Sequence, residues 1–310
     1  MTSSYAIAVA IGAALAFAVT EVSLRNSLRF ASLVTVSILT LLIQCLILST
    51  LIVMTGRFSE MTAAGAGWFL LAGLGNPVFH MVFYFLGIQR IGIVRSAPLK
   101  GSGPIFSVIF AFGFLGERLI LLQYLGIAMV VGGILIISTE GWSRNVPQTS
   151  PPPSGPPSDK DRPNAAPHRR AVYLLPVLAG LMGAIASILF KTAMKEMPSP
   201  LLGIWLGSAE GLLLFPLIAL LFPAGQRYRF NPSAIPWLIS AGVCGSAAMY
   251  GLVLSIGLGQ VSVVFTLAQS SPIFVILISV LFLRKLERVT PRVVLGGLMT
   301  VGGGILVSVL

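Results

Sequence analysis

Ten apolar runs, separated by short polar connections, restrict the fold of this chain more than any other feature. Each run is about 20 residues long, which is the length that an α-helix needs to cross a bilayer. A polar, proline-rich break separates the first five runs from the last five. The runs cover approximately residues 5–24, 31–54, 66–88, 92–115 and 120–139, and then 171–193, 200–222, 234–257, 261–283 and 291–310.

The composition is typical of an integral membrane protein. Of 310 residues, 56% are hydrophobic and only 9% are charged, with a mean hydropathy of +0.95, whereas a soluble domain is about a quarter charged. The net charge of +11 does not indicate nucleic acid as a partner, because the lysines and arginines occur singly between apolar runs. Cys45 and Cys244 lie inside apolar runs, so we expect no disulfide framework. The first residues lack a basic segment, so we expect the first run to be retained rather than cleaved.

The two halves of the chain are copies of one another. Pro104-Ile105-Phe106 is matched by Pro272-Ile273-Phe274 at an offset of 168 positions, and Glu117-Arg118 is matched by Glu287-Arg288 at an offset of 170 positions. The same offset joins glycines in the last run of each half: Gly126 with Gly296, Gly132 with Gly302, and Gly133 with Gly303. Chance rarely maintains so nearly constant an offset through so many positions, so the chain is a duplication. We expect these glycines to let the last runs of the two halves pack closely together.

The break divides the chain into three parts: a first repeat (1–140), a linker (141–170) and a second repeat (171–310). The linker combines prolines with Ser, Asp and Lys, and such a segment is expected to be disordered because it cannot bury apolar surface. Because each repeat has an odd number of helices, the chain enters the second repeat from the opposite side of the membrane, and the two repeats have inverted topology. We therefore predict an all-α integral membrane protein with ten transmembrane helices, built as two inverted-topology five-helix repeats, the plan of many secondary transporters.

The distribution of basic residues predicts the orientation in the cell membrane. Fifteen lysines and arginines lie in connections on the linker's side, and the other side has four: Arg57, Arg118, Lys191 and Lys195. The positive-inside rule therefore places the linker in the cytoplasm and both termini outside.

The order of proline, apolar run, Glu-Arg and glycine-bearing helix in each half resembles the EamA-type transporters of the drug/metabolite transporter superfamily. Tyr84-Phe85-Leu86-Gly87 before Arg90 is also similar to that family. The resemblance covers both halves but not the linker. It implies an exporter or exchanger of small metabolites, amino acids or drugs. It also implies cytoplasmic termini, the opposite of what the charge count predicts.

Lys100 is the leading candidate for substrate binding. It lies about eight residues into its run, on the order of 12 Å from the end, and an ionisable residue at such depth usually marks a site. Prolines around Lys100 and at corresponding places elsewhere predict broken helices that line the site, at Asn76, Pro77, Pro98, Pro104 and Pro272.

Five further polar residues inside the apolar runs are candidates for substrate binding. Glu210 could bind a proton or a cationic substrate, or simply pair with Lys100. His80 and Tyr250 occupy equivalent positions of the two repeats, and each could instead form an ordinary contact between helices. Gln44 and Gln269 could line a polar path or hydrogen-bond between helices.

Four other charged residues are interpreted as structural. Glu21 and Lys191 are equivalent in the two repeats, near the ends of their runs, where a side chain can reach the membrane interface. Glu117 and Glu287 are expected to cap helices.

The sequence argues against an enzyme, a metal or a cofactor. It holds two histidines, His80 and His168, no cluster with metal-ligand spacing, and no phosphate-binding loop for ATP. We expect a secondary active transporter of a small polar or amphiphilic metabolite, anionic or amino-acid-like, that works by alternating access in the lipid bilayer. Coupling to a proton or a counter-substrate, and a monomer or a homodimer, all agree with the sequence. The alternatives are proton-coupled multidrug or cation efflux, and a lipid-handling scaffold or flippase subunit that does not transport.

Overall fold

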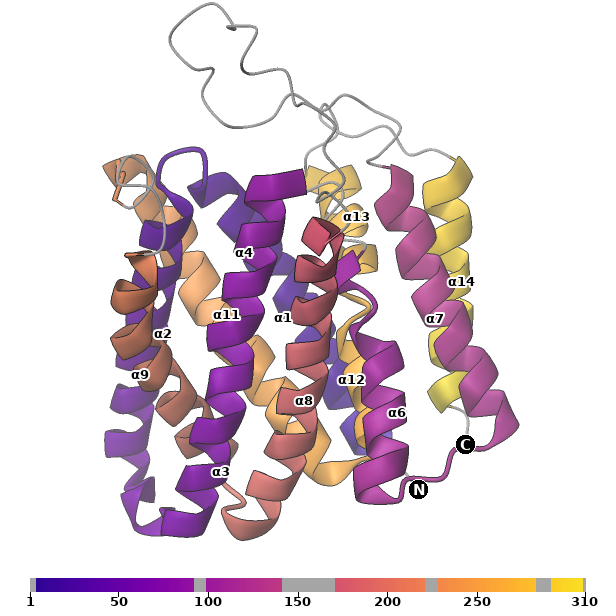
Figure 1. Cartoon of the computed structure of the whole chain (residues 1–310), viewed down its shortest axis with the longest axis horizontal. Helices are drawn as coiled ribbons and strands as arrows, with labels where there is room; N and C mark the ends of the chain where they lie inside the picture. Colours follow the sequence, from indigo (N-terminus) through magenta and orange to yellow (C-terminus); the bar gives the residue numbers. More distant parts are fainter. Residues whose placement is uncertain (1–3, 92–98, 141–170, 221–227, 283–290, 309–310) are drawn as a thin grey trace, which may run out of the picture.

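The computed structural model describes residues 4–91, 99–140, 171–220, 228–282 and 291–308, and within them it contains helices and no strand. The helices form one bundle, in which α1 begins and α14 ends on the same face (Figure 1). The first-half elements are α1 (Ser4–Ser27), α2 (Leu33–Thr55), η1 (Arg57–Glu60), α3 (Ala63–Gly73), η2 (Leu74–Phe79), α4 (His80–Ile91), α6 (Gly103–Leu115) and α7 (Leu121–Glu140). The second-half elements are η5 (Ala171–Tyr173), α8 (Leu174–Glu196), α9 (Pro200–Ala219), η6 (Pro232–Ala234), α11 (Ile235–Leu258), α12 (Val261–Ala268), α13 (Ser271–Phe282) and α14 (Pro291–Ser308).

Each of the ten apolar runs contains helix within the described residues. Six helical segments are long and apolar enough to cross a membrane: Ser4–Ser27, Leu33–Thr55, Ala63–Tyr84, Leu174–Glu196, Pro200–Ala219 and Pro232–Leu258. Helices α6, α12 and α13 are shorter and apolar, because the runs that hold them are interrupted, whereas α7 and α14 have 20 and 18 residues. The chain is thus an all-helical, multi-pass membrane protein, and the number of ten crossings stays a prediction. The predicted linker lies outside the described residues.

Helices α2 and α9, which occupy equivalent places in the two halves, pack against each other in opposite directions. In the α2–α9 pair, the Trp205 indole donates to Ser49 Oγ at 2.7 Å. A Cβ atom built on Gly211 would lie 3.2 Å from Leu41 Cδ1. Because residue numbers rise along α9 as they fall along α2, the two helices are antiparallel. Inverted repeats predict this relation.

The α7–α14 pair is also antiparallel and is joined through glycines, as the sequence predicted. A Cβ built on Gly133 would lie 2.5 Å from the Gly296 carbonyl oxygen, and one built on Gly303 would lie 2.5 Å from the Gly126 oxygen. The two contacts are related by the offset of 170 positions. Gly132, another of the predicted contact glycines, does not face the partner backbone. A Cβ built on it would lie 3.2 Å from Met299 Cε, the end of a flexible side chain. The glycines that bring the backbones together are therefore Gly133 and Gly303.

The other main contacts also join one half to the other. Helix α1 packs along α11, and the equivalent α8 packs along α3 and α4. Ser23 Oγ of α1 lies 2.9 Å from Ser240 Oγ of α11, within hydrogen-bond distance. Neither half is therefore a separate body, and the interface between the halves runs through the centre of the bundle (Figure 1).

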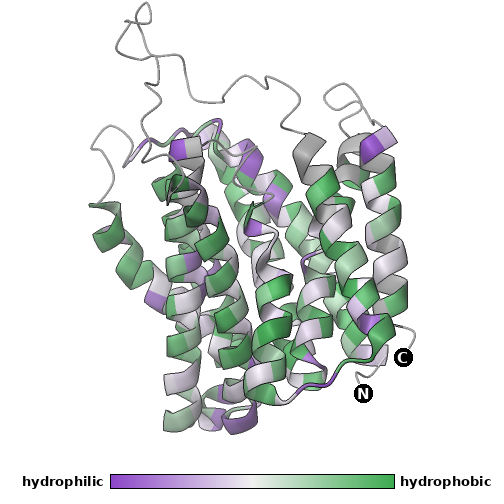
Figure 2. Ribbon diagram, turned by 45° about the vertical axis from the view of Figure 1, so that its right-hand side comes forward, coloured by the Kyte–Doolittle hydropathy of each residue, from purple (hydrophilic) through white to green (hydrophobic). Residues whose placement is uncertain are grey.

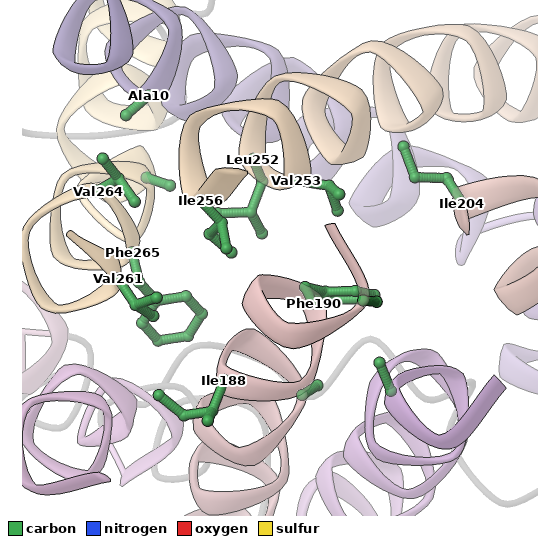
Figure 3. Packing of buried hydrophobic residues seen from close by; sticks show 14 of the residues in the cluster. Ala10, Ile188, Phe190, Ile204, Leu252, Val253, Ile256, Val261, Val264 and Phe265 are labelled. Atoms are coloured by element: carbon green, nitrogen blue, oxygen red, sulfur yellow. The ribbon is translucent and has the colours of Figure 1, made fainter. Parts of the chain in front are cut away.

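Apolar side chains fill the centre of the bundle around α12. All eight residues of α12 are buried, and Val261, Val264 and Phe265 belong to a cluster that includes Phe190 of α8 and Ile256 of α11 (Figure 3). Lipid tails are as apolar as these side chains, so close van der Waals packing rather than water exclusion holds the cluster together inside a membrane.

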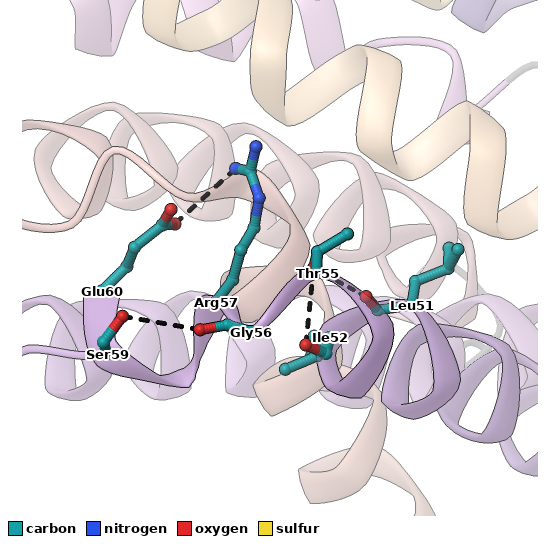
Figure 4. A network of polar contacts seen from close by, with 7 residues as sticks. All are labelled: Leu51, Ile52, Thr55, Gly56, Arg57, Ser59 and Glu60. Atoms are coloured by element: carbon teal, nitrogen blue, oxygen red, sulfur yellow. Dashed lines mark hydrogen bonds and ion pairs between the residues drawn. The ribbon is translucent and has the colours of Figure 1, made fainter.

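Polar residues gather at the ends of the helices (Figure 2). At the turn from α2 to α3, Gly56 adopts φ +67°, and its N–H bonds the Ile52 and Val53 carbonyls. The next residue, Arg57, lies 3.6 Å from Glu60 in an exposed ion pair (Figure 4). Such a pair contributes about 0–1 kcal/mol, so this turn marks the edge of the apolar zone more than it stabilises the fold.

Candidate functional site

The helix formed by α3 and α4 is broken at the predicted residues. Asn76 has φ −146° and ψ 113°, an extended conformation within the wide turn η2. Pro77 follows and has no N–H to donate to the helix. The break lies in the middle of an apolar run, and His80 begins α4 immediately after it.

Glycines of α8 allow α4 and the turn before α6 to approach closely. The His80 imidazole Nδ1 lies 2.9 Å from the Ala179 carbonyl oxygen, and a Cβ built on Gly183 would be 3.4 Å from the same nitrogen. A Cβ built on Gly180 would lie 2.7 Å from the Lys100 carbonyl oxygen. Because α8 belongs to the second half, His80 and Lys100 both lie where the two halves meet.

The Lys100 ammonium lies against an aromatic ring. Its Nζ is 4.8 Å from the centre of the Tyr84 ring, a cation–π contact that is worth about 0.5–2 kcal/mol. Tyr84 is one helical turn beyond His80, and the two rings are 6.3 Å apart. Their spacing of four residues places both on one face of α4. Lys100, Tyr84 and His80 therefore form one group.

Helix α6 begins just after Lys100, and its first residues explain why the run is interrupted. The Ser102 N–H and hydroxyl both donate to the Leu99 carbonyl, at 3.2 and 2.7 Å, which closes a turn. Pro104 is the second residue of α6, a position where no helical hydrogen bond is lost. The predicted break at Pro104 is thus a helix start, and Pro98 lies outside the described residues.

A carboxylate from α1 completes the group. The Ser271 hydroxyl donates to Glu21 Oε1 at 3.4 Å, and the charges of Glu21 and Lys100 both act on Tyr84. Ser271 opens α13 after a break at Gln269 and Ser270, and Pro272 is its second residue, so the second half contains the predicted interruption too. The residues Glu21, His80, Tyr84, Lys100 and Ser271 are called the central site below.

Within the described residues, no side-chain hydrogen bond or ion pair joins the remaining predicted residues to the central site. Gln269 ends α12, where its N–H bonds the Phe265 carbonyl at 3.0 Å. Gln44 is buried in α2, which packs on α9 and α11. Tyr250 is 38% exposed, on the same stripe of α11 as Ile239 and Val243, so it does not face its repeat counterpart His80.

Glu210 also makes its contacts with other elements than Lys100 does. Its carboxylate packs against Gly73 of α3, and no ion pair joins it to Lys100 in the described chain. The pairing of Lys100 with Glu210, one of the alternatives from the sequence, is therefore wrong. The reason is that α9 packs on α2 and α3, whereas the turn before α6 packs on α8.

Lys191, the counterpart of Glu21, corrects another expectation. Its ammonium does not reach toward the interface but donates to the carbonyls of Ile256, Gly257 and Gly259 at 2.8, 3.2 and 2.7 Å. These carbonyls end α11, where a helix leaves acceptors without partners. The sequence missed this role because nothing along the chain relates α8 to the end of α11.

The predicted capping role of Glu117 is confirmed, although the helix that it caps is distant in sequence. Glu117 Oε1 accepts from the Val261 N–H at 2.7 Å, and Oε2 accepts from the Ser262 N–H and hydroxyl at 3.2 and 2.6 Å. These donors open α12. Lys191 and Glu117 together fix the connection between α11 and α12, which is called the clamped junction below. Glu287 lies outside the described residues.

Sequence reasoning did not identify Tyr84, Ser271 or Glu21 as members of the site. Tyr84 could have been found from its spacing of four residues from His80. Glu21 could have been suspected because its counterpart Lys191 has the opposite charge, so the two cannot have the same partners. Ser271 carries no signal of its own in the sequence.

The central site can bind charges of both signs. The Lys100 ammonium lies against the Tyr84 ring, which neighbours the His80 imidazole, and the Glu21 carboxylate accepts from the Ser271 hydroxyl. Residues from α1, α4, the turn before α6 and α13 contribute, so both halves must hold their positions to keep the site intact. A small molecule with separate positive and negative groups would match this arrangement.

Comparisons with known proteins agree with the fold. A family profile described as the EamA-like transporter family matches residues 4–139 and 170–309. An uncharacterized transporter of Bacillus subtilis, YcbK, is 36% identical over 73 residues, which cover 24% of this chain and 22% of that protein. An uncharacterized transporter of a Sinorhizobium species, from the cobO 3′ region, is 30% identical over 102 residues, or 32% of this chain and 71% of that protein.

A crystal structure of another protein has the same fold. It superposes with a TM-score of 0.79 over 99% of this chain and 98% of that chain, at 16% sequence identity. Such a likeness concerns the fold alone. Together with the profile, which matches both halves, it leads to one conclusion: the chain is a multi-pass membrane protein that belongs to the EamA-like transporter family.

Proposed function

We propose that this protein is a secondary active transporter of a small zwitterionic, amino-acid-like metabolite, and that the substrate binds at the central site. The observation that carries the proposal is an ammonium and a carboxylate inside the bundle: Lys100 lies against Tyr84, and Glu21 of α1 accepts from Ser271 of α13, the helix on which α1 packs. The substrate's carboxylate would bind the Lys100 ammonium, and its amine would bind Glu21 beside Ser271.

The position of the central site supports transport by alternating access. In transporters built from inverted repeats, the substrate binds between the repeats, near the midplane, where broken helices free polar backbone groups. Here the breaks at Asn76–Pro77 and Gln269–Ser270 lie in the two different halves. Ten membrane crossings in two inverted repeats, with a linker at 141–170, complete the proposed architecture.

The cost of placing Lys100 in the bilayer also supports a functional role. A lysine in the hydrocarbon region costs about 2.5–3.5 kcal/mol on insertion scales. In the described chain, no carboxylate lies within ion-pair distance of Lys100, and the cation–π contact with Tyr84 offsets only part of the cost. An anionic group of the substrate would offset the rest while it is bound.

Thermal unfolding of the purified protein with three matched ligand sets would test the proposal. The sets are L-amino acids, the amines that they yield on loss of the carboxylate, and the carboxylic acids that lack the amine. A ligand that binds only the folded state raises the unfolding temperature, so we expect the intact amino acids to raise it most. Uptake of the best ligand into proteoliposomes would then show transport.

Substitutions assign each end of the ligand. Lys100→Met should weaken binding of amino acids and acids by about tenfold or more, equivalent to about 1.4 kcal/mol, and should leave amine binding intact. Glu21→Gln should do the reverse. Lys195→Met, an exposed lysine on α8, is the matched control. Equal stabilisation by amines alone, independent of Lys100, would favour cation efflux, and the absence of any uptake would favour a scaffold that does not transport.

A further inference from the structure

Glu210 lies outside the central site and is half-buried, yet one of its carboxylate oxygens is fully buried without a partner. It is the only ionisable residue of α9 and lies at the middle of that helix. Its Oε2 atom is buried and has no hydrogen-bond partner in the described chain. A carboxylate oxygen in this state is costly, because no donor replaces the water that it loses.

Close backbone contacts enclose one oxygen of the carboxyl group. Glu210 Oε2 occupies the place that a Cβ atom built on Gly73 would take. The same Cβ atom would lie 3.1 Å from the Gly207 Cα. The Pro77 ring packs on the same helix, 3.1 Å from a Cβ built on Gly211. Helix α3 ends at Gly73, and η2 follows at once. The carboxyl group therefore lies directly beside the broken part of the α3–α4 helix.

Glu210 also borders the exposed face of α9. Leu213 and Leu217, one and two turns further along, are 74% and 62% exposed. Because the structure belongs to a membrane protein, such leucines face lipid. The carboxyl group is thus close to the hydrocarbon region and accessible to an apolar reagent, although its Oε2 atom is enclosed.

The charges that could compensate Glu210 are absent from the elements around it. Helices α2 and α3 and the segment η2 carry no charged residue, and their only titratable side chain is Cys45. Helix α11 adds Cys244 and Tyr250. His80 follows η2 but contacts Ala179 of α8 instead.

We propose that Glu210 is a proton-binding site and that its protonation is linked to the arrangement of the break at Asn76–Pro77. A proton converts the carboxylate into a neutral acid and needs no space. A sodium ion would require several oxygen ligands, whereas the carboxyl group contacts glycine Cα atoms and lies near a proline ring. If the protein transports as proposed above, this site couples proton movement to the central site, because His80 lies four residues after Asn76.

Modification by dicyclohexylcarbodiimide tests the proton site without a substrate. This apolar reagent reacts with protonated carboxyl groups, and mass spectrometry locates the adduct. We expect labelling of Glu210 at mildly acidic pH that falls by about tenfold for each pH unit above its midpoint. Glu117, which accepts three hydrogen bonds, should remain unlabelled, and Glu210→Gln should lose the adduct.

A pair of glycine variants tests the geometry. Gly73→Ala should displace the carboxyl group from its enclosed position and shift the labelling midpoint to lower pH, whereas Gly67→Ala, whose added Cβ meets open space in the same helix, should change nothing. Absence of labelling, labelling independent of pH, or protection by Na⁺ at constant pH would each overturn the proposal. If Glu210 is labelled as expected but the protein binds no zwitterion, the proton site stands and only the proposed function is overturned.

Discussion

Glu21 and Lys191 show how two copies of one fold acquire different roles through a single residue. They occupy equivalent positions, 170 residues apart. An ammonium can donate to the three carbonyls at the end of α11, and Lys191 does so. A carboxylate cannot donate to carbonyls at all, so Glu21 could not serve the end of α4 in this way. It instead contacts Ser271 and acts on Tyr84, which makes this position part of the central site in the first half only.

Lys191→Met should destabilise the protein, because three carbonyls at the clamped junction lose a charged donor. Hydrogen bonds to charged groups are worth about 1.5–3 kcal/mol each, and some of this is recovered by water near the helix end, so we expect a loss of about 2 kcal/mol in the free energy of unfolding. Denaturant titration of the purified protein measures it. Lys195→Met should stay within about 0.5 kcal/mol of the parent, and a similar small effect at Lys191 would contradict the role given to the junction.

Glu117→Gln tests the other side of the clamped junction. The amide oxygen can still accept hydrogen bonds, but the amide nitrogen that replaces Oε2 or Oε1 faces a donor and leaves it unpaired. We expect a loss of about 1–3 kcal/mol and faster proteolysis between α11 and α12. If Lys191→Met and Glu117→Gln act on one junction, the double variant should lose less than the two single losses combined. Strict additivity would show that they act independently.

At the scale of the elements, the α7–α14 pair depends on close backbone approach. Gly133 and Gly303 each face a backbone carbonyl oxygen of the partner helix at a distance that leaves no space for a methyl group. Inside a membrane, small residues of this kind determine how near two helices can come. The outer positions Gly132 and Gly302 contact the ends of Met299 and Met129, which can move aside.

Gly133→Ala and Gly303→Ala should each separate α7 from α14. Because the obstacle is backbone, we expect a loss of about 1–3 kcal/mol, as for other overpacked interiors. Gly132→Ala and Gly302→Ala should be much milder. Gly113→Ala, whose added Cβ has open space in α6, is the control. Comparable unfolding temperatures for all five variants would show that the helix pair does not depend on these glycines.

At the scale of the whole molecule, the bundle is held by contacts between its halves, such as α1 with α11 and α8 with α3 and α4. The difference in positive charge between the two faces, which predicts the orientation, becomes larger once the contacts are known. Lys191 bonds carbonyls inside the protein and does not belong to an aqueous loop. Fewer free positive charges are left on the face opposite the linker, so the positive-inside rule favours a cytoplasmic linker more strongly.

Cysteine labelling tests this orientation. In a variant with Cys45 and Cys244 replaced by serine, Ser154→Cys in the linker should resist a membrane-impermeant thiol reagent in intact cells. Ser59→Cys in the exposed α2–α3 turn (Figure 4) should react. Both sites should react after the cells are opened. Labelling of Ser154→Cys with protection of Ser59→Cys would reverse the topology.

The sequence by itself determined the features that depend on order along the chain. Apolar length predicted the helices, the constant offset predicted paired halves, and prolines at 77, 104 and 272 predicted where helices are interrupted, because proline cannot donate a hydrogen bond. Glycines at a shared offset predicted the α7–α14 contact. Each of these follows from local chemistry or from repetition.

Only the tertiary structure decided which polar side chains meet. A charge in an apolar run requires some partner, but the sequence does not say which neighbouring helix supplies it. Lys100 lies on the ring of Tyr84, Lys191 bonds the end of α11, and Glu210 packs against Gly73. The physical reason is that the rotation and neighbours of each helix are chosen by packing over the whole bundle, between segments that can be more than a hundred residues apart.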